Sequence, residues 1–551
     1  MLLTLTIVLL WNCPALWCAD DVESPVPDES RLISKEALLR HVSFLGSDSL
    51  QGRGTGSEGE KLAARYLANI LEQAGIEPFG DEGTFFQKIP MHGSIVDKES
   101  DLRLTNASGE FQFILQKDYL LFKHGAQTFV PQPVPLVFVG YGIIAPEFDY
   151  NDYQNVDVSD KIVVYLSGEP VSEDDSFFNG PSATIYSFPE SKERIAISRG
   201  ARGSILIPNP LEKEQKPWEE WVKQYSFEDV TLSYSVSGHL SLILNPTSAQ
   251  RLFQDGAYTL EQVLHKHRQS SQASFPLAAS LSFKGKFQQR DFIASNVLGI
   301  LRGRDAQLAD SYLILSAHYD HLGVGPPVQG DSIYNGVFDN AFGVAALLEI
   351  ARAFSRKAVP PKRSVIFLFV TGEEKGLLGS TCYLDNPPVP LYKTIANVNI
   401  DGLAAFDTFH DVVGIGGELS TLGDILDVVA AALGMESSPI PPLFANEESF
   451  TRSDQLAFAK AGIPSILIMD GLNYHHIDYA QALKKWIDWR ENYYHTPFDD
   501  LSQPYDLAAA LQHSRFLYHF ADVLVNIAKP PEWKSGTTYI NARLQSMAEK
   551  K

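Results

Sequence analysis

Histidine and acidic side chains stand directly behind several apolar runs in the second half of the chain. The residues placed in this way are His318, Asp320, Asp339, Glu373, Glu374, Asp401 and Asp470, with His495 and Asp499 farther along. Each one alone has a structural interpretation, because Asp favours turns and a single His is usually hydrogen-bonded. Together they would repel one another or remain unpaired unless cations bound among them. Histidine with carboxylate is a zinc-type ligand set, so the pattern predicts a metal site.

The apolar runs that precede these residues have the length and composition of buried strands. Helical patterns separate them, including 342–354 with apolar residues on one side. Such alternation predicts an α/β fold with a mixed, largely parallel sheet sandwiched by helices. Ligands in such sheets lie beyond the carboxyl ends of the strands. The expected strands are Val297–Leu301, Tyr312–Ser316, Val365–Val370, Ala396–Ile400 and Ser465–Met469.

The first hundred residues contain two helical patterns and a glycine-rich loop. One helix is predicted over Ser34–Leu45, and a second begins at Ser57, where Glu60 completes a capping box, and ends at Gly75. The loop QGRGTGSEG lacks the Lys-Ser/Thr of a phosphate-binding loop. We therefore predict a turn before a helix there.

Residues 134–270 differ in character from the rest of the chain. They alternate apolar and polar residues between glycine turns, which is typical of strands. They offer no cluster of histidine and carboxylate side chains. This segment is predicted to be a separate β-rich module without chemistry of its own.

Composition limits the partners and the compartment. The 551 residues have a net charge of −22, which argues against nucleic acid and anionic membrane surfaces as partners. Residues 1–19 resemble a signal peptide, so export to the periplasm or the extracellular space is expected, with a lipid anchor at Cys18 as an alternative. No later run is long enough to span a bilayer. Cys382 would then be the only cysteine of the mature chain, which leaves no internal disulfide.

Six motifs occur along the chain in the same order as in a known family of enzymes. They are SAHYDHLG, YNGVFDNAFG, TGEEKGLLGS, NVNIDG, RSDQLAFAKAGIPS and YYHTPFDD. In these the chain resembles the co-catalytic di-zinc exopeptidases, which include secreted leucyl aminopeptidases, aminopeptidase Y and glutamate carboxypeptidase II. The β-rich module resembles their inserted protease-associated domain. The resemblance implies the zinc-peptidase fold, divided into a signal peptide (1–19), an N-terminal peptidase part (20–130), the insert (131–275), the main peptidase domain (276–530) and a C-terminal tail (531–551).

The family pattern implies a site with two zinc ions per chain. His318 and Asp401 would bind one ion, Glu374 and His495 the other, and Asp339 both. Glu373 would be the general base, and Asp320 would orient His318.

Further expectations follow from the same resemblance. Asp499 would orient His495, the Asp339–Asn340 peptide would be cis, and His321 would either support a ligand or belong to the loop. Gln455 stands where the family often has His and would line the substrate side. His475 and His476 lack a motif and are expected at the surface.

The implied activity is that of an aminopeptidase acting on peptides through a zinc-bridging water, with Glu373 accepting its proton. Alternatives are a carboxypeptidase or dipeptidase on the same site, a non-catalytic receptor-like homologue, and a glutaminyl cyclase with one zinc. The insert would be a lid that restricts access, or a protein-binding module. The oligomeric state is left open.

Overall fold

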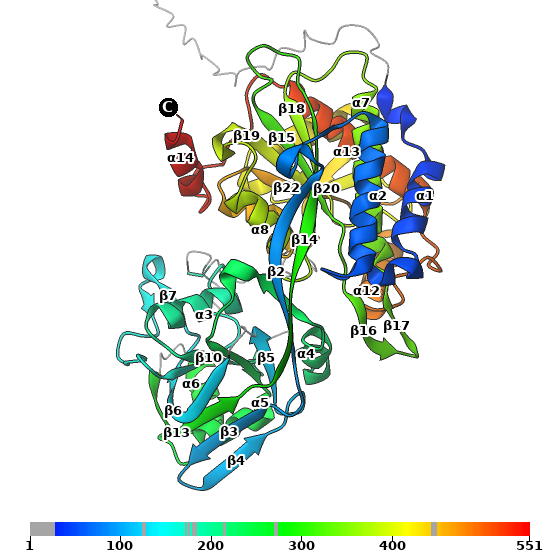
Figure 1. The fold of residues 1–551 in the computed structure, drawn as a ribbon. Helices are drawn as coiled ribbons and strands as arrows, with labels where there is room; N and C mark the ends of the chain where they lie inside the picture. Colours follow the sequence, from blue (N-terminus) through cyan, green and yellow to red (C-terminus); the bar gives the residue numbers. More distant parts are fainter. Residues whose placement is uncertain are drawn as a thin grey trace, which may run out of the picture.

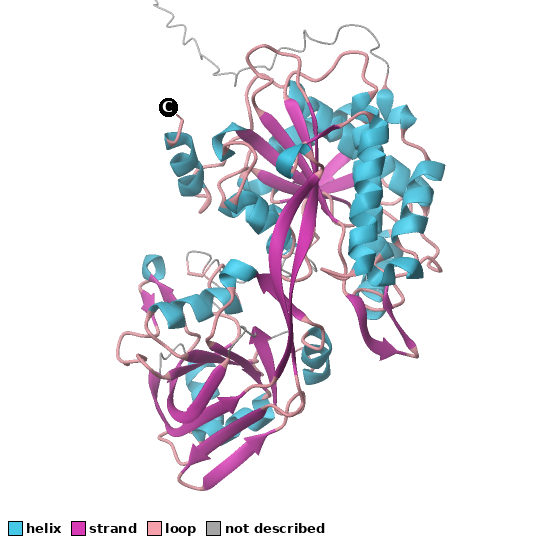
Figure 2. Cartoon of the chain, in the orientation of Figure 1, coloured by secondary structure: helices cyan, strands magenta, loops and turns pink. Residues whose placement is uncertain are grey.

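The computed structural model describes residues 28–123, 128–170, 174, 177–178, 184–212, 216–268, 274–441 and 449–550. It consists of two sheet-containing bodies joined by two long strands, as Figures 1 and 2 show. The expected signal peptide, with Cys18, lies outside the described residues.

The larger body is built on one mixed sheet. Its order is β11-β2-β14-β18-β15-β19-β22-β20-β21, with β1 (Glu77–Pro78) paired to β14. The four central strands β18 (Ser364–Val370), β15 (Tyr312–His318), β19 (Thr394–Asn399) and β22 (Ser465–Asp470) are mutually parallel. The flanking strands are β14 (Phe287–Leu301), β2 (Phe86–Val96), β11 (Asp229–Leu232), β20 (Asp411–Ile415) and β21 (Glu436–Ser438). The mixed α/β sheet is confirmed, but parallel pairing prevails only at its centre, because β11, β2 and β14 pair antiparallel.

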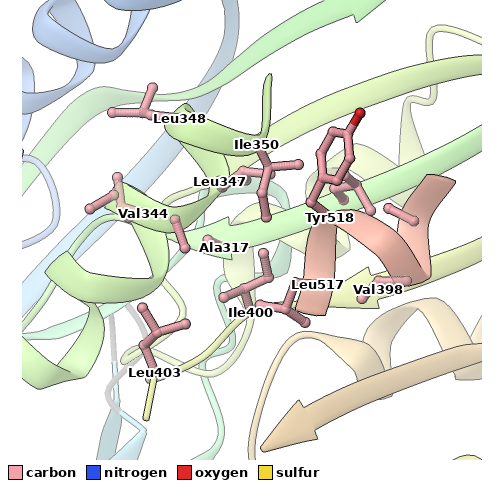
Figure 3. Close-up of a cluster of buried hydrophobic side chains, with 14 of the residues drawn as sticks. Ala317, Val344, Leu347, Leu348, Ile350, Val398, Ile400, Leu403, Leu517 and Tyr518 are labelled. Atoms are coloured by element: carbon pink, nitrogen blue, oxygen red, sulfur yellow. The ribbon is translucent and has the colours of Figure 1, made fainter. Parts of the chain in front are cut away.

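Helices cover both faces of this sheet. The core of one face includes residues of α1 (Lys35–Leu45), α2 (Glu58–Ala74), α7 (Phe342–Ser355), α9 (Leu422–Ala432) and α13 (Leu507–Asn526). The opposite face buries residues of α8 (Leu378–Asp385) and α11 (Gln455–Lys460). Figure 3 shows side chains of α7 and α13 gathered over Ala317 and Val398. These strands are apolar on both sides because both sides are buried.

The smaller body contains a second sheet, in the order β4-β3-β13-β6-β9-β10-β12-β5. Its strands are β3 (Asp101–Asn106), β4 (Gly109–Phe113), β5 (Tyr119–Lys123), β6 (Phe129–Val139), β9 (Ile162–Leu166), β10 (Gly203–Ile207), β12 (Leu240–Leu244) and β13 (Ser274–Lys284). Helices α3 (Pro189–Ser198), α4 (Trp218–Gln224), α5 (Pro246–Ala249) and α6 (Leu260–Arg268) accompany it. Strands β3 to β5 therefore lie in this sheet although they precede residue 131.

The two bodies share strands. β2 and β14 pair antiparallel from Phe86 opposite Val297 to Val96 opposite Phe287, and run from one sheet toward the other (Figure 1). The chain also returns once to the larger body, where β11 pairs with β2. The smaller body is thus anchored by three strands of the main sheet.

Several other elements complete the larger body. A hairpin of β16 (Gly323–Val328) and β17 (Asp331–Tyr334) follows β15, and α12 (Tyr479–Asn492) precedes the last motif. The C-terminal segment contains α14 (Ile540–Ala548). The described helices include none with the apolar length needed to cross a bilayer. Cys382 is free and buried.

The start of α2 differs in detail from the expected capping box. The Ser57 hydroxyl accepts a hydrogen bond from the Glu60 amide at 3.1 Å, as predicted. The Glu60 carboxylate, however, accepts from the Gly56 amide at 2.7 Å and contacts the Thr371 hydroxyl. Burial raises the pKa of Glu60 to about 8, although the Thr371 hydrogen bond opposes the shift. Glu60 therefore links α2 to the loop that follows β18.

Candidate metal centre

The parallel centre of the main sheet brings the expected side chains together. His318 is the last residue of β15, while Glu373 and Glu374 follow β18 and Asp401 follows β19. Because these strands are parallel neighbours, their carboxyl ends meet at one edge of the sheet. Asp339 joins them from the segment just before α7.

One group of potential ligands forms around His318. Its Nε2 lies 3.1 Å from Asp339 Oδ1 and 3.1 Å from Asp401 Oδ1. His318 is 1% exposed, so its ring contacts these carboxylates inside the protein and not at the surface. The three side chains form a group that could hold a cation.

A second group forms on the other oxygen of Asp339. His495 Nε2 lies 3.2 Å from Asp339 Oδ2 and 3.2 Å from Glu374 Oε2. His321 lies beside this group, with its ligand atom near those of Asp339 and Glu374 and its Nδ1 2.6 Å from Glu374 Oε1. Asp339 therefore contacts two histidines through two different oxygens.

Electrostatics shows that this cluster needs positive charge. Burial would lower the pKa of His318, but Asp401 and Glu373 raise it well above its ordinary value. In the same way Glu374 and Asp339 overcome burial and raise the pKa of His495 to about 9. Burial would raise the pKa of Asp339, yet hydrogen bonds from the two histidines bring it well below its usual range.

The donor set fits metal ions. The raised pKa values of His318 and His495 favour positive charge among these carboxylates, and a bound cation would supply that charge in place of protons. Three of the carboxylates, Asp339, Glu374 and Asp401, lie within 3.2 Å of a histidine nitrogen. Histidine nitrogens and carboxylate oxygens are the ligands that zinc prefers in catalytic sites. The residues present thus suit two cations that share Asp339.

Glu373 lies beside the two groups but in neither. It is 9% exposed, and burial raises its pKa well above the ordinary value. His318 opposes that shift, while Glu374 and Asp401 add to it. A carboxylate that holds a proton readily next to a cation site is suited to move protons.

Asp320 supports the site in a different way from the expected one. Its carboxylate accepts hydrogen bonds from the Thr55 hydroxyl at 2.9 Å and from the Glu373 amide at 3.2 Å. His318 Nδ1 lies 3.9 Å from that carboxylate but 3.2 Å from the Asp320 backbone oxygen. The carbonyl, rather than the carboxylate, is placed to orient His318, and the carboxylate holds the backbone of Glu373.

Asp499 also has partners other than the expected His495. Its oxygens accept hydrogen bonds from the Phe338 and Asp339 amides at 2.8 and 3.0 Å. The Tyr505 hydroxyl donates to it at 2.6 Å. Asp499 therefore fixes the backbone that carries Asp339, whose peptide bond to Asn340 is cis as predicted.

The glycine-rich loop before α2 contributes residues that sequence reasoning missed. Arg53 is 1% exposed and donates to the backbone oxygens of Tyr319, Asn335 and Gly336 at 2.8, 2.6 and 2.9 Å. Burial lowers its pKa to about 10, against the opposing field of Asp320. Thr55 of the same loop holds Asp320. Their only signal was the density of glycines, which permits close approach to the chain after β15.

Gln455 does not line a substrate surface. It is fully buried, accepts a hydrogen bond from Asn399 Nδ2 at 2.9 Å and donates to the Phe450 oxygen at 2.9 Å. The expectation for this position was wrong, because the side chain is fully buried and hydrogen-bonded to Asn399 and to the Phe450 backbone. Arg452, by contrast, is exposed and donates to the Tyr494 hydroxyl at 3.1 Å.

His475 and His476 are exposed, as expected. His476 Nδ1 lies 2.7 Å from the Asp407 carboxylate, and the rings of His475 and His410 are 3.8 Å apart. Neither residue belongs to the two groups around Asp339.

Comparisons with known proteins found relatives of this chain. Residues 296–521 match the model of peptidase family M28. Aminopeptidase YwaD of Bacillus subtilis is 25% identical over 213 residues, which is 38% of this chain and 40% of that protein. Leupeptin-inactivating enzyme 1 of Streptomyces exfoliatus is 28% identical over 204 residues, 36% of this chain and 42% of that protein. The chain thus spans less than half the length of these curated relatives.

A solved structure extends the likeness of fold to nearly the whole chain. The aminopeptidase from Aneurinibacillus sp. strain AM-1 aligns with a TM-score of 0.54 at 18% identity. The alignment covers 92% of this chain and 97% of that one. It confirms the fold.

Proposed function

We propose that this protein is a zinc-dependent aminopeptidase that removes N-terminal residues from peptides, a proposal supported by the match of residues 296–521 to the model of peptidase family M28. The observation that carries the proposal is the double contact of Asp339, whose two oxygens face His318 and His495. A carboxylate shared between two histidine–carboxylate groups suits a pair of neighbouring catalytic cations.

The residues that would hold zinc divide into two sets. His318 and Asp401 would bind one ion, Glu374 and His495 the other, and Asp339 both. Zinc bound there would supply Lewis acidity, which polarises a carbonyl and acidifies water. Asp499 and the Asp320 carbonyl keep Asp339 and His318 in position for this.

Glu373 is the proposed proton carrier. It accepts a proton from the attacking water and returns it to the leaving amine. Its raised pKa makes the protonated form accessible, and the hydrogen bond from its amide to Asp320 holds its backbone at the edge of the site. General acid–base catalysis of this kind contributes about 10²- to 10⁴-fold to a rate.

The proposed direction of cleavage is supported by the name of one relative, aminopeptidase YwaD. One observation favours a carboxypeptidase or dipeptidase instead. Arg452 is an exposed cation whose charge interacts with Glu373 and Asp401, so it could hold a substrate carboxylate. Peptides with a free or a blocked amino terminus distinguish the two activities.

The decisive experiment digests a defined pentapeptide and follows its products by mass spectrometry. An aminopeptidase releases residues one at a time from the N-terminus and leaves an N-acetylated peptide intact. Release from the C-terminus would replace the proposal by the second candidate. Absence of any cleavage by the zinc-loaded protein would refute a peptidase altogether.

The smaller body is proposed to be a protease-associated domain that limits access to the site. Its return segment supports this, because the Phe227 ring packs 5.0 Å from that of Tyr334 in the β16–β17 hairpin. We also propose export, on the signal-like pattern of residues 1–19.

A further inference from the structure

His321 is a buried histidine beside the second group for which the proposed chemistry has no use. It is fully buried, and its Nε2 has no hydrogen-bond partner among the described residues. Its Nδ1 lies 2.6 Å from Glu374 Oε1, which is itself without a hydrogen bond of good geometry. A buried polar atom without a partner is costly, so the placement of this ring calls for a reason.

Distances distinguish His321 from the expected ligands. Zinc ligands at about 2.0–2.1 Å in a tetrahedral arrangement lie about 3.3 Å apart. The contacts of His318 and His495 with their carboxylates, at 3.1 and 3.2 Å, are close to that spacing. The 2.6 Å contact of His321 is too short for two ligands of one ion, and it is nearer the length of a charge-assisted hydrogen bond.

The two oxygens of Glu374 consequently have different neighbours. Oε2 faces His495, and Oε1 faces His321. A donor on Oε1 would stop the carboxylate from rotating and would keep Oε2 directed toward Asp339 and His495. Partners of this kind commonly orient the residues that bind a metal.

The surrounding backbone is shaped to hold the imidazole ring. The His321 amide donates to the Arg53 oxygen at 3.3 Å, and the ring meets that of His495 edge-on at 5.7 Å. Gly336 has a φ of +60°, and a Cβ there would lie 2.5 Å from the Cγ of His321. Glycine is therefore required at 336 both for its backbone conformation and for the space that the ring occupies.

We infer that His321 is a positioning residue that donates its Nδ1 hydrogen to Glu374 Oε1 and so selects the orientation in which Glu374 can bind the second cation. The inference rests on the proposed metal site and adds to it a residue outside its ligand set.

Two amide variants test this inference. In His321→Asn the side-chain nitrogen occupies the place of Nδ1, whereas in His321→Gln it reaches the place of Nε2. Zinc affinity of both sites is measured by competition with a chromophoric chelator, with metal content per chain and the melting temperature of the metal-free protein recorded alongside. We expect His321→Gln to weaken one of the two binding constants about 10- to 100-fold and to leave the other unchanged. His321→Asn should retain both constants within a fewfold of the wild type.

The measurements distinguish a failure of the His321 inference from a failure of the proposed metal site. Equal affinities in His321→Gln and the wild type would overturn the inference, and so would a loss in His321→Asn as large as that in His321→Gln. A wild-type chain that binds fewer than two zinc ions would instead contradict the proposed site itself.

Discussion

At the scale of single residues, the proposed site separates the carboxylates that contact histidines from Glu373, the proposed proton carrier. Asp339, Glu374 and Asp401 contact histidines directly, whereas Glu373 does so only through the electrostatic field. Two adjacent glutamates thus have different environments: histidine lowers the pKa of Glu374 against the effect of burial, and burial raises that of Glu373. Divergent pKa values in neighbouring acids often mark different catalytic roles.

Replacement of Glu373 by Gln tests that division. The amide keeps the shape of the side chain but cannot accept a proton, so kcat should fall by about 10²- to 10⁴-fold. Zinc content should stay at the wild-type value, because Glu373 is outside both ligand groups. Steady-state kinetics and metal analysis check both parts, with the exposed Glu72→Gln as control. Near-normal kcat in E373Q would remove Glu373 from the reaction.

At the scale of elements, the part of the site that could be predicted is the part carried by strand ends. His318, Glu374 and Asp401 follow apolar runs, and parallel pairing alone brings them together. Sequence spacing does not show how distant loops dock on that edge. Arg53 and Thr55 were therefore missed, and Asp499 was assigned to His495 although it holds the Asp339 amide.

Gln455 is a second position at which the sequence did not predict the contacts of a side chain. Its motif places it near the site, but motif position does not tell which way a side chain points. The structure buries it against Asn399, a residue that periodicity marks only as part of an apolar strand. Polar groups inside a core can be recognised only from their partners.

Helix α13 provides a pH-dependent test at this scale. His513 is buried between the Ala404 amide, at 3.0 Å from Nδ1, and the Ile468 oxygen, at 3.1 Å from Nε2. Burial lowers its pKa to about 4 from the ordinary 6.5. Between pH 6.5 and pH 4 the unfolded chain therefore binds more protons at His513 than the folded chain does. The resulting contribution to the free energy of unfolding, about 3 kcal/mol, is present above pH 6.5 and is lost as the pH falls toward 4.

Urea unfolding of the wild type and of His513→Gln at several pH values measures this contribution. The wild type should lose more stability than the variant between pH 6.5 and 4.5, while both share the loss from other groups. His475→Gln, at an exposed position, should follow the wild type. Parallel curves for all three proteins would show that His513 does not contribute.

At the scale of the whole molecule, the smaller body is anchored beside the metal centre. Arg290 of β14 joins the two parts, because it donates to Glu228 at 2.7 and 2.6 Å and to the backbone oxygens of Thr55 and Gly56 at 3.1 and 3.0 Å. Glu228 lies one residue before β11, where the chain of the smaller body enters the main sheet. Movement of this body would therefore change the surroundings of the site.

Loosening this anchor should change the preferred length of peptide. Arg290→Ala removes the contacts that fix residue 228 to the loop before α2, so kcat/KM for a decapeptide should rise severalfold relative to that for a dipeptide amide. Activity on the dipeptide amide serves as the control, because it reports damage to Thr55 and Asp320 rather than access. Arg290→Lys retains the charge and should show a smaller change. An unchanged ratio in Arg290→Ala would contradict a restricting role for the smaller body.

The central claim is that one carboxylate, Asp339, is shared by two cation sites. Anomalous scattering at the zinc edge, from crystals grown with zinc, tests it directly. We predict two peaks per chain on either side of the Asp339 carboxylate, one next to His318 and Asp401 and the other next to Glu374 and His495. A single peak, or a second peak away from Asp339, would contradict the account.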